Sequence, residues 1–111
     1  MINLERRDSI DIVKFSINKI NALVSEEIKS DILKILDQSN IRLIIDLGGV
    51  EYIDSSGFGC FLSLMRSSRD NYSHMKIVCP EASVMTLFET LHLQTIFEIY
   101  DDLDECIRSF N

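Results

Sequence analysis

A run of branched aliphatic residues near the middle of the chain constrains the fold more than any other feature. Residues 41–47 (IRLIIDL) show almost no alternation of apolar and polar side chains, and Gly48-Gly49 follows directly. A strand of this kind is buried on both faces, as in parallel sheets that are covered by helices. The sequence therefore predicts an α/β architecture with residues 41–47 in the middle of the sheet.

Strand-like and helix-like segments alternate along the rest of the chain. Apolar alternation or β-branched runs predict strands, and apolar residues at helical spacing predict helices. The expected strands cover residues 2–6, 10–17, 41–47, 75–79 and 96–99, the first two joined by an Arg7-Asp8-Ser9 turn. The expected helices run from an N-cap at Ser25 to Leu36, from Ser55 or Ser56 to Asp70-Asn71, from a cap at or near Ser83 or in the preceding loop to Leu91, and over residues 103–110. This alternation predicts a mixed sheet of about four to five strands with helices packed against it.

Size and charge narrow the classes of function. The chain has 111 residues, which fits one domain over residues 1–111, and its formal net charge is −7. An acidic surface repels phosphate backbones and anionic lipids, so we expect no nucleic-acid partner and no membrane partner. We expect instead a protein partner with a basic surface.

The cysteines and the N-terminus predict a cytoplasmic protein. Cys60, Cys79 and Cys106 are widely spaced, form no C-x-x-C pair and stand in apolar neighbourhoods. This pattern argues against a disulfide framework or a zinc site and favours a packing role. The charged residues 1–8 do not resemble a signal peptide, and no stretch approaches the ~20 apolar residues of a membrane span.

Residues 50–59 (VEYIDSSGFG) break the local rules for a helix start. Gly57 and Gly59 fall in the first turns of a helix, where glycine costs up to about 1 kcal/mol against alanine. Bare backbone at a helix N-terminus favours an anion, so a serine hydroxyl there would be a good phosphoryl acceptor. The competing interpretation is an ordinary Asp-Ser-Ser cap, with glycines that allow close packing of the helix on the sheet. The residues alone leave both open.

Catalytic motifs are absent from this segment and from the rest of the chain. Asp54 and Phe58 occupy the glycine positions of a G-x-S-x-G nucleophile elbow around Ser56, and nothing in the sequence places His74 or His92 near the serines. No histidine or carboxylate cluster has metal-ligand spacing. We therefore expect no enzyme, no cofactor and no metal.

The same segment resembles the signature of STAS domains, specifically the bacterial anti-sigma factor antagonists. In that family an aliphatic strand ending in D-L is followed by a short loop and by aromatic-aliphatic-D-S-[ST]-G-[LF]-G; residues 44–47 (IIDL) and 52–59 (YIDSSGFG) match it. Residues 87–97 (LFETLHLQTIF) are similar to the family's L-F-x-x-x-G-L-x-x-x-F, with His92 in place of glycine. The resemblance covers nearly the whole chain and implies a STAS-like fold.

The resemblance also implies a function and a role for each matched residue. An unphosphorylated antagonist of this family binds an anti-sigma factor that is also a serine kinase, and so releases the sigma factor. The kinase then phosphorylates the serine after the aspartate, here Ser55, and a PP2C-type phosphatase reverses the reaction. By this resemblance Asp54 orients the loop and contacts the partner, and Ser56 is a helix cap or nearby contact, or the acceptor if the register is shifted by one. Gly57 supplies bare backbone and, with Gly59, leaves room for the kinase.

One departure from the family concerns the loop that meets the kinase. Family members commonly carry G-E-L-D there, whereas this chain has Asn18-Lys19-Ile20-Asn21. Asn21 is thus expected at the partner surface, but the identity of the partner is left open. Alternatives are a STAS scaffold subunit of a larger assembly, of stressosome or lipid-transport type, without a phospho-switch, and a receiver-like domain phosphorylated on Asp46 or Asp54. An enzyme is the weakest alternative.

Overall fold

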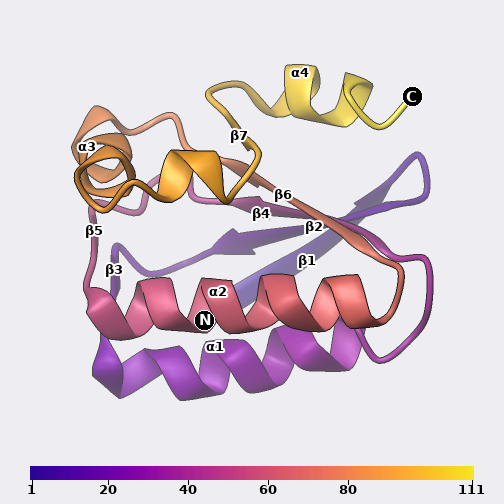
Figure 1. The fold of residues 1–111 in the computed structure, drawn as a ribbon, viewed down its shortest axis with the longest axis horizontal. Coiled ribbons are helices and arrows are strands. Elements are labelled where there is room, and N and C mark those ends of the chain that lie inside the picture. Colours follow the sequence, from indigo (N-terminus) through magenta and orange to yellow (C-terminus); the bar gives the residue numbers. More distant parts are fainter.

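A five-stranded mixed sheet forms the centre of the molecule, and the computed structural model describes all residues 1–111 (Figure 1). The strands lie in the order β1 (Ile2–Arg7), β2 (Ile10–Phe15), β4 (Arg42–Asp46), β6 (His74–Val78) and β7 (Ile99–Tyr100). Only the β1–β2 pair is antiparallel. The helical elements are α1 (Ala22–Ile35), α2 (Ser55–Asp70), α3 (Ala82–Thr90), the 3-10 turn η1 (Leu93–Thr95) and α4 (Leu103–Arg108). The predicted α/β class with a mixed sheet is confirmed.

The helices divide between the two faces of the sheet, and β4 is buried on both of them. Figure 1 shows α1 and α2 on one face and α4 on the other. Leu43 and Ile45 belong to the larger hydrophobic core, which contains residues of α1 and α2. Ile44 points the other way, into a smaller core with residues of α4. The aliphatic run is therefore explained by burial on both sides, as the sequence predicts.

One predicted helix cap is wrong. α1 begins at Ala22 instead of following Ser25, and its N-cap is Asn21, whose side-chain oxygen accepts a hydrogen bond from the Leu23 N–H at 3.0 Å. Asparagine caps a helix as well as serine does, so composition alone did not separate the two positions. Ser25 lies buried inside the helix. The cap of α3, expected at or near Ser83 or in the preceding loop, is Glu81 of that loop, and the helix begins at Ala82.

The expected strand over residues 96–99 is displaced, since β7 comprises only Ile99–Tyr100. Phe97 is buried instead among aromatic rings, with its ring 5.8 Å from that of Phe88 in an edge-to-face arrangement. Such a pair adds about 0.5–1.5 kcal/mol to the gain from burial, which outweighs a local strand preference. Similarly, β2 ends at Phe15 and not at residue 17.

A second sheet of two very short parallel strands was not predicted. It pairs β3 (Lys19–Ile20) with β5 (Tyr52–Ile53), Lys19 beside Tyr52 and Ile20 beside Ile53. Two residues are too few to show a periodic pattern, so the sequence carries no signal for them. This small sheet lies directly before the starts of α1 and α2 and determines the geometry described below.

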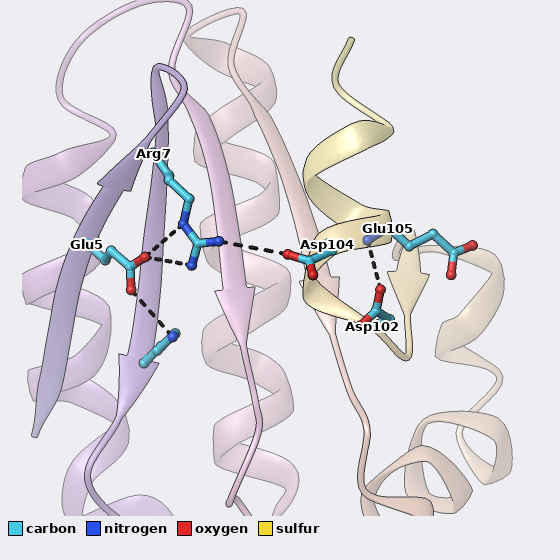
Figure 2. Close-up of polar contacts among 6 residues, drawn as sticks. Glu5, Arg7, Asp102, Asp104 and Glu105 are labelled. Carbon is cyan, nitrogen blue, oxygen red and sulfur yellow. Dashed lines mark hydrogen bonds and ion pairs between the residues drawn. The ribbon is translucent and has the colours of Figure 1, made fainter.

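The β1–β2 hairpin turns on two residues, Asp8 and Ser9, which have φ angles of 53° and 65°. Two consecutive positive φ values are typical of a type I′ turn, whose twist matches that of the strands. Arg7, expected in the turn, ends β1. Its guanidinium lies 2.7 Å from Glu5 and 3.8 Å from Asp104 of α4, so Glu5 and Arg7 face the α4 side (Figure 2).

All three cysteines are free and buried, as the apolar surroundings predict. Cys60 and Cys79 belong to the larger core and Cys106 to the smaller one. Burial raises the pKa of the Cys60 and Cys79 thiols to about 11, and that of Cys106 to about 12. The nucleophilic thiolate is therefore scarce at neutral pH.

Candidate functional site

The small sheet places the N-termini of α1 and α2 beside each other. α1 follows β3 and α2 follows β5, and these two strands pair in parallel. The Asp54 N–H continues the pairing by donating to the Ile20 carbonyl at 3.0 Å. Asn21 and Asp54 are consequently the N-caps of two neighbouring helices. Residues more than thirty positions apart in the sequence meet at one site.

Asp54 is held by hydrogen bonds at the start of α2. Its Oδ1 accepts from the Ser56 hydroxyl at 2.6 Å and from the Gly57 N–H at 3.1 Å. These two donors, the hydroxyl first, lower the pKa of the Asp54 carboxyl, with smaller contributions from the backbone N–H groups of Ser56 and Ala22. Because Ala22 is the first residue of α1, the carboxylate interacts with both helix starts. Asp54 is therefore ionised and fixed in orientation at neutral pH.

The two serines differ sharply in their surroundings. Ser55 is the first residue of α2, is exposed, and its hydroxyl makes no hydrogen bond within the chain. Ser56 is half-buried and its hydroxyl is taken by Asp54. The expectation that Ser56 caps the helix is wrong, because Asp54 does so and Ser56 supports the cap. Its role as a nearby contact of the partner stays a prediction.

Gly57 and Gly59 are glycines for different reasons. A Cβ at buried Gly57 would lie 2.6 Å from Cγ2 of Ile53 and 3.0 Å from both Cγ2 and the carbonyl oxygen of Ile20. Gly57 thus lets the first turn of α2 pack on the small sheet, which agrees with the close-packing interpretation. A Cβ at exposed Gly59 would have no neighbour within 4 Å. Packing does not explain the glycine at position 59.

Two exposed apolar side chains beside these residues were missed by sequence reasoning. Leu23, in the first turn of α1, is 91% exposed, and Tyr52 of β5 is 48% exposed. A predicted helix that begins at Ala22 has its buried face at Ser25, Ile28 and Ile32, and this places Leu23 on the solvent side. The prediction that the helix follows Ser25 hid this signal. Asn21, expected at the partner surface, lies beside them with its side chain engaged as a cap. Its contact with a partner remains a prediction, as does that of Gly57.

Neither histidine of the chain lies at this site. His74 lies at the amino end of β6, whereas α2 begins beyond the carboxyl end of the neighbouring parallel strand β4, so the two lie at opposite ends of these strands. His92 stands at the end of α3 in a left-handed conformation, with φ 56°. No group of three or more potential metal ligands is brought together. None of the helices has both the length and the apolar character needed to span a bilayer. Asp46, the other acid considered, accepts from the Gly48 N–H at 2.9 Å.

Comparisons with known proteins bear on the whole chain. The family model described as STAS domain matches residues 1–106. An anti-sigma-B factor antagonist of Listeria monocytogenes is 31% identical over 98 residues, which cover 88% of this chain and 86% of the relative. A solved anti-sigma-factor antagonist (STAS) domain protein from Planctomyces limnophilus superimposes with a TM-score of 0.88 at 16% identity, covering 99% of this chain and 97% of the other. The Bacillus cell fate determinant SpoIIAA in the phosphorylated form superimposes with a TM-score of 0.73 at 18% identity over the whole of both chains.

Proposed function

The chain belongs to the STAS-domain family of anti-sigma factor antagonists, and we propose that it acts as such an antagonist, switched off by phosphorylation of Ser55. In this proposal the unphosphorylated chain binds an anti-sigma factor that is also a serine kinase, which frees the sigma factor. A PP2C-type phosphatase restores the active form. The chain needs no cofactor and acts in the cytoplasm, by binding and not by catalysis.

The observation that carries the proposal is the contrast between the two serines. A kinase needs a hydroxyl that can reach its γ-phosphate in line with the leaving group. The Ser55 hydroxyl is exposed and unbonded, whereas the Ser56 hydroxyl donates to Asp54 at 2.6 Å. Transfer to Ser56 would break a short bond to a carboxylate, and transfer to Ser55 breaks none. This difference supports Ser55 as the acceptor.

Charge at the start of α2 explains how a phosphate would act. A phosphoserine adds about −1.5 to −2 charge at pH 7. Asp54 already places a carboxylate there and accepts a hydrogen bond from the Gly57 N–H. Only some of the backbone N–H groups at the start of α2 would therefore be available to a phosphate at position 55. Two neighbouring anions are hard to desolvate against a partner. Phosphorylation should therefore break the complex while the fold, which uses Asp54 and not Ser55, stays intact.

The surface around Ser55 has the character of a protein-binding site. Leu23 and Tyr52 expose apolar area on either helix start, and Gly59 lies one helical turn beyond Ser55 on the same side of α2. Aromatic and aliphatic anchors of this kind supply most of the energy in protein interfaces. Asn21 belongs to the same surface, and the departure of its loop from the common family pattern is where we expect partner choice to be decided. The net charge of −7 favours a basic partner face.

A reconstitution with the chain's own serine kinase tests the proposal. Candidate anti-sigma factor kinases from the same genome are titrated against the wild-type chain, incubated with ATP, and the phosphorylated residue is mapped by mass spectrometry. We expect phosphate on Ser55 and release of the complex. Ser55→Ala should bind and stay unmodified, whereas Ser56→Ala, the matched control, should still be phosphorylated.

Two results would count against the proposal. Phosphate on Ser56, with Ser55→Ala modified at the normal rate, would show that the acceptor is the next serine. A chain that binds in a larger STAS assembly, and whose assembly is indifferent to Ser55→Asp, would favour a scaffold role without a phospho-switch.

A further inference from the structure

The free edge of β1 is an unpaired docking surface outside the Ser55 site, and we infer that a second copy of this chain pairs with it in antiparallel fashion. β1 is the terminal strand of the five-stranded sheet, six residues long and without proline. Leu4, at its centre, is 56% exposed. Such an edge presents unpaired N–H and C=O groups and is a template for another strand.

The register of the hairpin fixes which backbone groups point outward. In an antiparallel pair only every second residue exchanges hydrogen bonds with the partner strand. The Ser16 N–H donates to the Met1 carbonyl at 2.9 Å, and the Cα partners run from Ile2–Phe15 to Arg7–Ile10. The backbone N–H and C=O groups of the odd-numbered residues of β1, and those of Met1, therefore point toward β2. The N–H and C=O groups of Ile2, Leu4 and Arg6 point away from the sheet.

The charges of β1, which would normally protect an edge, are already paired within the chain. Glu5 lies 2.7 Å from Arg7 and 3.4 Å from Lys14, on the side of α4 (Figure 2). Arg6 lies 3.5 Å from Asp11. None of these groups needs to lose a partner for a strand to approach. Leu4 is left as an apolar side chain in the middle of the edge.

The outward-facing residues are self-complementary in one register. Pairing Leu4 with Leu4 of the partner chain also pairs Ile2 with Arg6 and Arg6 with Ile2, which gives three hydrogen-bonded pairs. On the other face of the strand Asn3 then lies opposite Glu5. Moving the register one way, to Leu4 opposite Arg6, sets the two Glu5 side chains against each other, and like charges directly opposite are destabilising. Moving it the other way, to Ile2 opposite Leu4, leaves only two hydrogen-bonded pairs. The two-fold register centred on Leu4 is the favoured one.

The overall charge opposes this association and predicts its salt dependence. Each copy carries −7, so two copies repel at low ionic strength. Salt screens this repulsion but affects backbone hydrogen bonds and the Leu4 contact far less. We therefore expect a weak dimer that strengthens as salt is added, which is the opposite of what an ion-paired interface would do.

Sedimentation equilibrium of the whole chain tests the inference between roughly 10 µM and 1 mM, the range of weak complexes. The average mass should rise from 12.8 kDa toward twice that value, and more steeply at higher salt. Leu4→Lys should weaken the dimer at least about tenfold, because it sets two ammonium groups opposite each other. Leu4→Pro should do the same without unfolding the chain, since the Leu4 N–H makes no bond to β2. Leu23→Lys, at a more exposed leucine in α1, should leave the dimer unchanged.

Cross-linking tests the register. Cα atoms of a hydrogen-bonded antiparallel pair lie about 5.5 Å apart, within the range that a disulfide spans. Under mild oxidation Leu4→Cys should give a linked dimer several times faster than Leu23→Cys, which reports random collision; the three native cysteines are buried. A wild-type chain that remains at 12.8 kDa throughout would overturn the inference, as would equal linking rates for the two cysteine variants.

Discussion

A single methyl group added at Gly57 or at Gly59 should have opposite effects on stability, although the two glycines are only two residues apart in α2. At Gly59 the new Cβ meets nothing within 4 Å. Alanine is more favourable than glycine in a helix by up to about 1 kcal/mol, so Gly59→Ala should stabilise the chain by about 0.5–1 kcal/mol. For a chain of 111 residues this corresponds to a rise in Tm of about 2–4 °C.

At Gly57 the same methyl group has no room. It would lie 2.6 Å from Cγ2 of Ile53, closer than real Cβ contacts, and 3.0 Å from the Ile20 carbonyl, which is fixed by the small sheet. Forcing an extra methyl group into packed structure costs about 1–3 kcal/mol, which exceeds the gain in helix propensity. Gly57→Ala should therefore lower the free energy of unfolding by about 1–2 kcal/mol net, or Tm by about 4–8 °C.

Thermal unfolding of both variants, followed by titration with the partner kinase, separates packing from binding. We expect Gly59→Ala to be more stable than the wild type and yet to bind the kinase more weakly, since position 59 lies one turn beyond Ser55 on the proposed contact surface. A destabilised Gly59→Ala, or a Gly57→Ala variant as stable as the wild type, would refute the packing argument. A Gly59→Ala variant with normal affinity would remove position 59 from the contact surface.

Three further predictions concern the same helix start. Ser55→Asp should leave Tm within a few degrees of the wild type, because Ser55 makes no hydrogen bond, and should weaken kinase binding in a titration; unchanged affinity would contradict the switch. Ser56→Ala should cost about 1 kcal/mol in chemical denaturation through loss of the bond to Asp54, and an unaltered unfolding midpoint would show that this bond contributes nothing. The pKa of Asp54 is lower in the folded chain than the value of about 3.9 expected when the chain is unfolded. The ionised carboxylate therefore stabilises the fold above that value, and this stabilisation is lost as the pH falls through the folded pKa. Asp54→Asn should flatten this part of the curve of stability against pH, measured by acid unfolding.

Much of the sheet could be predicted because its signals are local and long enough to read. The aliphatic run around Ile44 identified a strand buried on both faces, and helical spacing after Asp54 located each end of α2 to within one residue. The two-residue strands β3 and β5 offered no period, and the position of Phe97 depends on Phe88, which no local pattern reveals. The features that were missed are those that depend on contacts between residues far apart in the sequence.

The part of the site that could be predicted is the part encoded by neighbouring residues. Asp54, Ser55 and Ser56 are consecutive, so one motif contains them, but the hydrogen bond that distinguishes the two serines is a matter of side-chain geometry. The exposure of Leu23 followed only from the true N-cap of α1, Asn21, which lies one turn before the cap that the sequence suggested. The meeting of the two helix starts depends on β3 pairing with β5, and that contact is visible only in three dimensions.

The division of the hydrophobic core by the sheet gives each layer its own chemical reporter. Cys106 is enclosed only while α4 stays on the sheet, whereas Cys60 and Cys79 are enclosed by the layer that contains α1 and α2. α4 has six residues and a small core, so it is the element expected to detach at the lowest free energy, well below that of global unfolding. A thiol reagent added to the native chain should then label Cys106 first, at a rate set by the opening of α4, and reach Cys60 only when the larger layer opens. The order in which the native cysteines are labelled would thus report the local stability of the layers on the two faces of the sheet, without any engineered probe.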